Sequence, residues 1–476
     1  MNFRRSFLLT SLSMLIGGTL SLSAQCIRQD EKPVFRVTDG VFYNLYDENA
    51  PKVITPVPRG YQVAGISHHG RHGSRYCGSD ETSYRLLAEV LEKAHADGAL
   101  TERGEMIYRA YAACLPALVG REGELTQLGQ RQHRGIAERM YRQYKGLFTA
   151  KDVVLTAWST RYPRCIQSMG AFCMQLTRLN ARLEIEMDAS SHHLIQLSGY
   201  QDYIFWRGGD WEEIEAKKEA YDRKLIRVEP FARALLKDPS YPAGDLMALE
   251  QGLWAVYEDL PSCDCWGTPE CAAYRYAIDG RACPCGPEME PFFDDDSWRQ
   301  LVLSSELFYL FAICDDSIMG SNRLGIFATE AVLKLAERDL ASGKPFVRLR
   351  FGHDTDIQAH LSNIGVEGWR NWMGATGLTA EEGWQKTLDE WSLSRIPMAS
   401  NLQMIFYRRT ARKADGKDAP EILFKLMLNE SELRLPIPAV SGRIYDWEVF
   451  KAYMEPRIRA AKEKALPYLK QPYPVF

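Results

Sequence analysis

The chain carries little net charge and few long apolar runs. Its 476 residues include 58 lysines and arginines against 62 aspartates and glutamates, a formal net charge of −4. Such a chain has no overall attraction for nucleic acid or an anionic membrane, so a local basic cleft would have to draw an anionic ligand. Beyond residue 24 no stretch is long and apolar enough to cross a bilayer, so no transmembrane segment is expected. The 46% of hydrophobic residues can bury one large core and a smaller lobe.

The apolar run near the N-terminus has the pattern of a secretory signal peptide. Arg4 and Arg5 precede an apolar run over 7–22, and the small Ala24 precedes a plausible cleavage point. We expect a signal peptide over 1–24 and export to the periplasm or outer surface of a bacterium. A lipid anchor on Cys26 is the disfavoured alternative, because Gln25 rather than a small residue precedes that cysteine.

Eleven cysteines favour export over a reducing cytosol. Five of them crowd into one segment: Cys263, Cys265, Cys271, Cys283 and Cys285. The segment lacks the Cys-x-x-Cys pairs that zinc sites normally use, so we prefer disulfides and keep a zinc site as the alternative. Cys77 has no base arranged beside it in the sequence and is interpreted as structural.

The segment 67–75, Ser-His-His-Gly-Arg-His-Gly-Ser-Arg, is the strongest functional signal. It sets the imidazole of His72 between the guanidinium groups of Arg71 and Arg75, beside a glycine that lets the backbone approach a ligand. Arginine forks suit doubly charged oxyanions, and a neutral imidazole among them is placed to attack phosphorus. A metal site at His68, His69 and His72 is disfavoured because the flanking arginines repel a cation. A merely solvated loop is the other alternative.

A second motif follows an alternating strand pattern over 346–351. It reads Gly352-His353-Asp354-Thr355-Asp356. A carboxylic acid at a strand end can supply the proton that a departing alkoxide needs, and the neighbouring histidine can hydrogen-bond a phosphate. The alternative role for Asp354 is to cap a helix beginning near Ile357, and both roles can hold together.

Together the two motifs resemble those of the histidine acid phosphatases, which include bacterial and fungal phytases and multiple inositol polyphosphate phosphatases. The segment 125–129, followed by an amphipathic helix to Tyr144, resembles the family's Leu-Thr-x-x-Gly. The segment 152–168 is similar to the one that carries the family's third phosphate-binding arginine, and the spacing to Ser168 selects Arg164 over Arg161. The segments 397–406 and 424–429 resemble the closing pair of strands. Residues 185–320 match nothing in the family.

Two residues that differ from the family pattern, and one motif that follows it, bear on the identity of the substrate. Tyr76 stands where the family usually has proline, and Asp356 stands where acid phosphatases often have asparagine. The inositol-polyphosphate branch often has His-Ala-Glu where this chain keeps His353-Asp354. These features leave the chemistry intact and put the substrate in question.

The resemblance implies a nucleophile, His72, and a proton donor, Asp354, with phosphate bound by Arg71, Arg75, Arg164 and His353. It implies no metal or other cofactor and a small phosphomonoester as the partner, most readily an inositol polyphosphate such as phytate. Alternatives are sugar phosphates or nucleotides, or an inactive protein that binds phosphate esters; His353-Asp354 and export disfavour a mutase. The three arginines should lower the pKa of His72 and keep it nucleophilic in mild acid. We expect a monomer or dimer.

Three strand patterns each end next to a motif that contains candidate site residues. They cover 62–67, 152–157 and 346–351. Helical patterns over 82–95 and 164–179 follow two of them. We therefore expect an α/β fold, with a mainly parallel sheet flanked by helices on both faces and the ligand at the strand ends. Residues 25–184 and 321–476 would form this core. Residues 185–320, with a helix over 211–227, would form an inserted, mostly helical cap containing the cysteine-rich segment. Asp294 to Asp296 is expected to be a solvated turn rather than a calcium loop.

Overall fold

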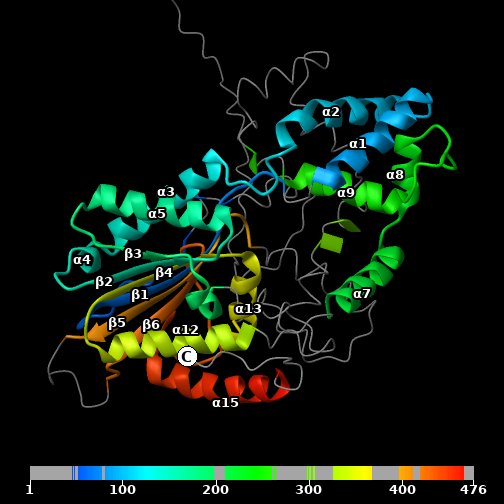
Figure 1. The fold of residues 1–476 in the computed structure, drawn as a ribbon. Coiled ribbons are helices and arrows are strands. Elements are labelled where there is room, and N and C mark those ends of the chain that lie inside the picture. Colours follow the sequence, from blue (N-terminus) through cyan, green and yellow to red (C-terminus); the bar gives the residue numbers. More distant parts are fainter. Residues whose placement is uncertain are drawn as a thin grey trace, which may run out of the picture.

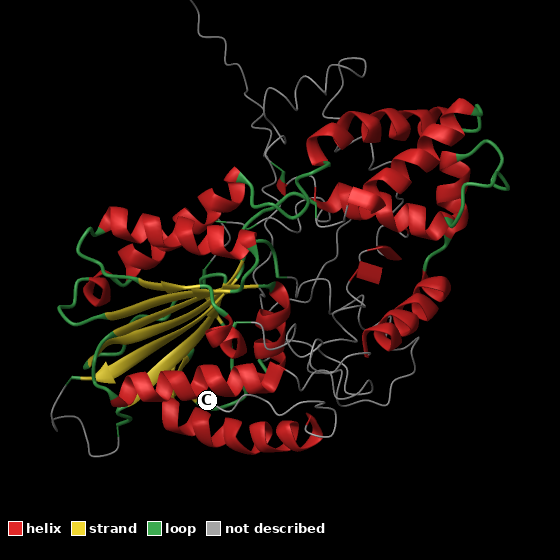
Figure 2. Ribbon diagram, in the orientation of Figure 1, coloured by secondary structure: helices red, strands yellow, loops and turns green. Residues whose placement is uncertain are grey.

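A nine-stranded sheet lies between two layers of helices, with a further group of helices beside it (Figures 1 and 2). This architecture is seen in a computed structural model of the chain. The model describes residues 46, 48, 52–77, 81–197, 210–259, 262–263, 297, 300–301, 304–305, 325–366, 396–410 and 419–465.

The strands follow the order β3-β2-β4-β1-β5-β6-β9-β8, with β7 paired to β6. Their bounds are β1 (Tyr61–Arg71), β2 (Val154–Ser159), β3 (Glu186–Asp188), β4 (Phe346–Gly352), β5 (Asn401–Arg409), β6 (Ile422–Leu428), β7 (Ser431–Glu432), β8 (Ala439–Ser441) and β9 (Ile444–Asp446). The pairs β3–β2, β2–β4 and β4–β1 are parallel, whereas β5 and the strands beyond it add antiparallel pairs. The α/β class is confirmed, and the three strands that end at the predicted chemistry lie in the parallel half.

Helices cover both faces of the sheet, as predicted. One face is covered by α3 (Gln127–Gln143), α4 (Lys145–Phe148) and α5 (Pro163–Leu179). On this face Ile136 and Phe172 pack with Leu349 in one core cluster. The other face is covered by α12 (Gly325–Ala341), α13 (Asp354–Ile364) and α15 (Trp447–Ala465). There Leu361 and Phe450 pack with other fully buried apolar side chains.

Local signals set the ends of the helices that lie closest to the strand ends. Thr126 caps α3 by accepting a hydrogen bond from the amide of Gly129, and Pro163 begins α5, where its missing N–H costs nothing. Gly365, with φ 72°, ends α13 in the left-handed conformation that glycine adopts without strain. The helix predicted over 164–179 is confirmed by α5.

The second group of helices shares its own apolar core. It contains α1 (Glu81–Ala96), α2 (Glu102–Leu118), α8 (Val228–Leu235) and α9 (Leu246–Asp259), with α7 (Asp210–Leu225) next to them in Figure 1. We call α1, α2, α8 and α9 the helical lobe. Leu91, Ile107, Phe231 and Leu253 from its four helices are fully buried together. The helices predicted over 82–95 and 211–227 are confirmed by α1 and α7.

The helical lobe is built from two separate chain segments. Helices α8 and α9 come from the range predicted to be an inserted cap, but α1 and α2 come from the range assigned to the core. The short 3-10 helix η2 (Ser191–Gln196) packs against α12 beside the sheet, although it too falls within the predicted cap. The division into a core and a cap over 185–320 therefore stays a prediction.

Several predicted features lie outside the described residues. These are the signal peptide, Cys26, the cysteines from 265 to 285, and the turn at 294–296. Cys77, Cys165 and Cys173 are buried free thiols, and Cys263 donates a hydrogen bond to the carbonyl of Asp259. In the part of the chain that the structure describes, no helix combines the length and apolar character needed to span a membrane.

Candidate active site

The ends of three parallel strands bring the predicted site residues together. Arg71 is the last residue of β1 and pairs with Gly352, the last residue of β4. Ser159 ends β2 and pairs with Phe351 of β4. The loops that leave these three strands therefore start at one edge of the sheet, where ligands bind in open α/β sheets.

His72 is fixed on both sides of its backbone. Its amide donates to the carbonyl of Gly352 at 3.0 Å, and its carbonyl accepts from the amide of Ala399 at 2.8 Å. Its ring is buried, with Nδ1 2.9 Å from the carbonyl oxygen of Gly73. A carbonyl only accepts hydrogen bonds, so Nδ1 carries the proton and the lone pair of the neutral ring is on Nε2. The ring centroid of His353 lies 5.6 Å from that of His72.

The loop after His72 rests on α3 through a close backbone approach. A Cβ atom on Gly73 would lie 2.5 Å from the carbonyl oxygen of Gly129, so this position accepts no larger residue without movement. The Ser74 amide donates to Oε1 of Gln132 at 2.8 Å, and Nε2 of Gln132 donates to the Ser74 hydroxyl at 2.9 Å. Thr126 donates from Oγ1 to the Ser74 carbonyl at 2.9 Å. These contacts give the Leu-Thr-x-x-Gly segment its physical role of supporting the loop.

The three predicted arginines approach the two histidines from different elements. Arg71 lies with Nη2 3.2 Å from Oδ2 of Asp354 and donates from Nη1 to the carbonyl of Ile396. Arg75 pairs from Nη1 with Oδ2 of Asp259 at 2.8 Å. Arg164 lies in the first turn of α5, with its guanidinium 4.9 Å from the ring centroid of Tyr162. Arg161 is exposed in the loop between β2 and α5.

Burial and the arginines keep both histidines neutral. Burial lowers the pKa of His72 well below its usual 6.5, and the charges of Arg164 and Arg71 lower it further. Burial also lowers the pKa of His353 to about 3, again with help from Arg164. The predicted lowering of the pKa of His72 is confirmed, but burial rather than the arginines is its largest cause. A neutral, nucleophilic ring in mild acid follows from both effects.

Asp354 is the first residue of α13, and His353 takes the N-cap position before it. The expectation of a helix beginning near Ile357 was therefore wrong by one turn, because Thr355 and Asp356 are buried within the helix instead of lying in a polar loop. Oδ1 of Asp354 accepts from the Thr355 amide at 3.0 Å. A carboxylate at this end of a helix is favoured by the helix dipole, so its helix contact and its place beside Arg71 coexist.

The histidines of the first motif do not converge on one point. His68 packs with Phe172 and Phe351 on the α5 side of the sheet, whereas His69 packs against His360 of α13. Successive residues of a strand point to opposite faces, so β1 separates these two rings. Among the described residues no group of three or more His, Cys, Asp or Glu side chains is arranged to hold a metal ion.

Two side chains at the site were missed from the sequence. The ring of Tyr162 meets that of His353 edge-on, with centroids 4.9 Å apart. The Cys165 thiol lies 3.4 Å from the carbonyl oxygen of Gly352 and 3.8 Å from Nε2 of His353. Both flank Arg164 in the chain within two residues, which was the available signal, although a pattern of residue types does not show which way they point.

Comparisons with known proteins place this geometry in a known fold. No protein-family model matches the chain, and no curated protein matches it in sequence. The multiple inositol polyphosphate phosphatase of Bifidobacterium longum, in complex with inositol hexasulfate, matches with a TM-score of 0.65 at 14% identity, over 86% of this chain and 97% of its own. The phytase of D. castellii matches with a TM-score of 0.61 at 13% identity, over 92% of this chain and 86% of its own. The chain has the fold of these phosphatases.

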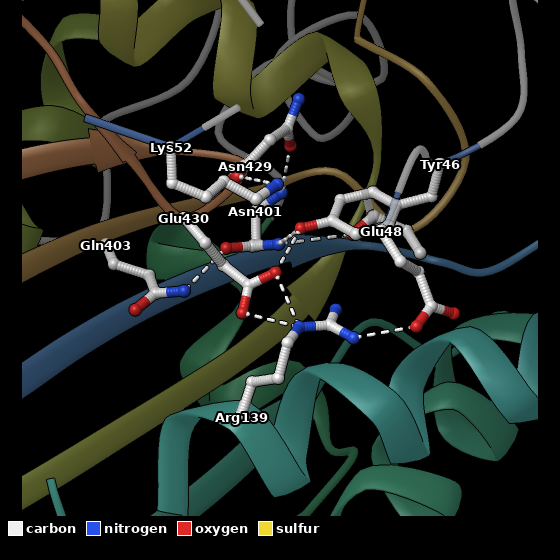
Figure 3. Close-up of polar contacts among 9 residues, drawn as sticks. Tyr46, Glu48, Lys52, Arg139, Asn401, Gln403, Asn429 and Glu430 are labelled. Carbon is white, nitrogen blue, oxygen red and sulfur yellow. Dashed lines mark hydrogen bonds and ion pairs between the residues drawn. The ribbon is translucent and has the colours of Figure 1, made fainter. Parts of the chain in front are cut away.

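Within this phosphatase fold, a polar network supports the segment that holds His72. Ala399, with φ 61°, lies two residues before Asn401, whose amide donates to Oδ1 of Asn429 at 3.1 Å. Figure 3 shows Glu430 between Tyr46, whose hydroxyl donates to it at 2.6 Å, and Arg139 of α3, whose Nε donates to it at 2.9 Å. Further bonds reach Glu48, Lys52 and Gln403. The strained Ala399 is thus held from several elements.

Proposed function

We propose that the protein hydrolyses phosphomonoesters through a covalent phosphohistidine, with inositol polyphosphates as its substrates. The single observation that carries the proposal is the state of His72. Its proton is held on Nδ1 by the Gly73 carbonyl, which leaves Nε2 as a neutral nucleophile among three arginines. Arginines and a neutral imidazole in this arrangement suit a phosphate dianion and the negative charge of its transition state.

The reaction would proceed in two steps, transfer of the phosphoryl group to His72 and hydrolysis of the phosphohistidine. Phosphate is bound by Arg71, Arg75, Arg164 and His353. Nε2 of His72 forms a bond to phosphorus as the ester P–O bond breaks, and Asp354 donates its proton to the departing alkoxide. In the second step Asp354 takes a proton from water, which attacks phosphorus and breaks the P–N bond. His72 is then regenerated and phosphate is released.

The substrate class is supported by the solved structures that share the fold. These include a multiple inositol polyphosphate phosphatase in complex with inositol hexasulfate and with phosphate, and a phytase. Phytate, lower inositol phosphates, sugar phosphates and nucleotides should be compared by released phosphate. We expect the highest kcat/KM for phytate or a lower inositol phosphate. Equal or higher values for sugar phosphates or nucleotides would favour a broad-specificity acid phosphatase.

Turnover of p-nitrophenyl phosphate tests whether the protein is an enzyme at all. We expect turnover that inorganic phosphate inhibits competitively. A protein that binds phosphate esters without turnover would contradict the proposal and leave a binding protein of the same fold.

We also propose export with removal of residues 1–24, which N-terminal mass spectrometry of the protein from its producing cells would test. A mature chain that keeps Arg4 and Arg5 would contradict export by this signal.

A further inference from the structure

We propose that Asp259, the last residue of α9, is a positioning residue that holds Arg75 in the phosphate site. The inference rests on the proposed function, because it assigns Arg75 to phosphate binding. It extends that function to the helical lobe, since Asp259 belongs to this lobe rather than to the sheet or its two covering layers.

The contact is direct and largely shielded from water. Nη1 of Arg75 donates to Oδ2 of Asp259 at 2.8 Å and to the carbonyl of Tyr76 at 2.9 Å. The side chains of Arg75 and Asp259 are 16% and 12% exposed, so solvent screens the pair less than it would an exposed pair. A guanidinium has five N–H donors in a planar fork, so an ion pair at one nitrogen is compatible with phosphate at another.

The end of α9 is fixed to the same loop by other contacts. Cys77, two residues after Arg75, donates from its thiol to the carbonyl of Val256 at 3.7 Å. Tyr76 and Cys77 lie in the apolar core of the helical lobe together with Val256. The chain therefore passes from the phosphate loop into the core of the lobe within two residues. A displacement of α9 would move Asp259 relative to Arg75.

The position of this carboxylate is unfavourable for the helix itself. The C-terminal end of a helix carries partial negative charge, which favours cations there and disfavours an aspartate. Helix α9 has no basic residue in its last turn to offset this effect. The ion pair with Arg75 offsets this unfavourable position.

The site has a physical need for such an anchor. Arg75 lies close enough to Arg164 and His72 for its positive charge to lower the pKa of both groups. Without a phosphate present, the like charges of Arg75 and Arg164 repel each other. Arg71 is balanced by Asp354, but that carboxylate must take and give a proton in the proposed reaction. Asp259 has no such duty, so it can hold Arg75 throughout the cycle.

The experiment measures phosphate binding and turnover in Asp259→Ala and Asp259→Asn. Calorimetry with inorganic phosphate should give a dissociation constant that is raised roughly tenfold in Asp259→Ala. This is the order expected when phosphate binding has to immobilise the Arg75 side chain that Asp259 no longer holds in place. KM for p-nitrophenyl phosphate should rise with it, while kcat changes by less than about threefold, because ground-state and transition-state binding are weakened alike. Asp259→Asn keeps an acceptor for Nη1 and should fall between the wild type and Asp259→Ala.

Two controls separate positioning from a loss of stability. Glu229→Ala removes an exposed carboxylate that pairs with Arg233 in the same lobe, and it should leave the dissociation constant unchanged. In an Arg75→Ala background, Asp259→Ala should have no further effect on phosphate binding, because the partner is already absent. Should Asp259→Ala not fold, the same comparison with Asp259→Asn decides the question.

Three results would overturn the inference. An unchanged dissociation constant would make Asp259 purely structural, and tighter phosphate binding would make it a competitor for Arg75. A failure of the unmutated protein to bind phosphate would overturn both this inference and the proposed function. Phosphate binding that depends on Asp259, in a protein without turnover, would overturn the catalytic proposal alone.

Discussion

Two groups of histidines lie along and around β1, and the same physical effect acts on both. In the site, His72 and His353 are buried beside arginines. Further back, His68 and His69 are buried within the sheet, with His133 of α3 and His360 of α13 near them. Burial is the largest cause of the lowered pKa in every member of both groups.

The difference lies in what surrounds the ring nitrogens. Nδ1 of His72 is hydrogen-bonded to the Gly73 carbonyl, so Nδ1 carries the proton and Nε2 can act as the nucleophile. Neither nitrogen of His69 has a hydrogen-bond partner among the described residues. The histidines behind the site are neutral through burial and the charge of Arg350, so neutrality does not by itself mark a nucleophile. His72 differs in that its tautomer is fixed and three arginines lie around it.

The largest expected effect is the loss of His72. His72→Ala should lower turnover by about 10⁴-fold or more, because His72 is the group that carries the phosphoryl group in the proposed mechanism. Alkaline quench of the unmutated protein during turnover should trap a base-stable phosphoenzyme, which is then lost on acid treatment. His95→Ala, an exposed change, is the control and should keep activity within about twofold. Appreciable turnover by His72→Ala would remove the distinction between the two groups of histidines.

The next effect separates the two roles of Asp354. Asp354→Asn should slow phosphoenzyme formation from inositol phosphates by about 10²–10⁴-fold more than from p-nitrophenyl phosphate, whose leaving group departs readily as an anion. Rapid-quench measurement of phosphoenzyme formation checks this, because later hydrolysis can limit turnover of the aryl ester.

A contribution of Asp354 to helix stability alone predicts another pattern. Both substrates would then be slowed equally, and the melting temperature would fall by the equivalent of about 1 kcal/mol. Equal losses at an unchanged melting temperature would mean that another carboxylate is the donor. Asp356, buried in the first turn of α13, would be tested first.

The buried histidines behind the site should make the fold sensitive to acid. Burial lowers the pKa of His133 from 6.5 to about 3. Below pH 6.5 His133 binds a proton in the unfolded chain but not in the folded protein. The free energy of unfolding therefore falls as the pH falls from 6.5 towards about 3. The loss is about 1.4 kcal/mol per pH unit for each such histidine. Activity should persist in mild acid for as long as the protein stays folded, because burial and the arginines lower the pKa of His72 well below 6.5.

Denaturant unfolding of His133→Leu across this pH range checks the effect. Relative to the unmutated protein, the variant should gain about 1.4 kcal/mol per pH unit as the pH falls below 6.5. Phe172→Leu, in the same ring cluster but without a titratable group, should lower stability by the same amount at every pH. A pH-independent difference for His133→Leu would show that His133 is protonated in the folded protein.

The smallest effect is expected from metal removal. The arginines around His72 favour an anion over a cation, so EDTA should change activity by less than about twofold. Vanadate, a phosphate-like oxyanion, should inhibit competitively. Activity lost in EDTA and restored by zinc or magnesium would contradict the metal-free mechanism and revive the alternative of a zinc site in the cysteine-rich segment.

Much of the sheet and of the site could be read from local patterns. The strands that carry the chemistry appear as short alternating or apolar runs, and Arg71, His72 and Arg75 lie within five consecutive residues. The helix after Pro163 and the cap at Thr126 follow from residue types at fixed offsets. The start of α13 could not be read this way, because Thr355 and Asp356 are polar residues that the fold buries.

The sequence by itself determined which groups meet at the strand ends, because parallel strands place their carboxyl ends at one edge and each group lies next to its strand. Only the tertiary structure decided which distant residues support them. Three features depend on contacts between segments far apart in the chain: the approach of Gly129 to Gly73, the hydrogen bonds between Ser74 and Gln132, and the packing of α1 and α2 on α8 and α9. No local period encodes such contacts, since the side chains concerned are brought together only when separate elements pack.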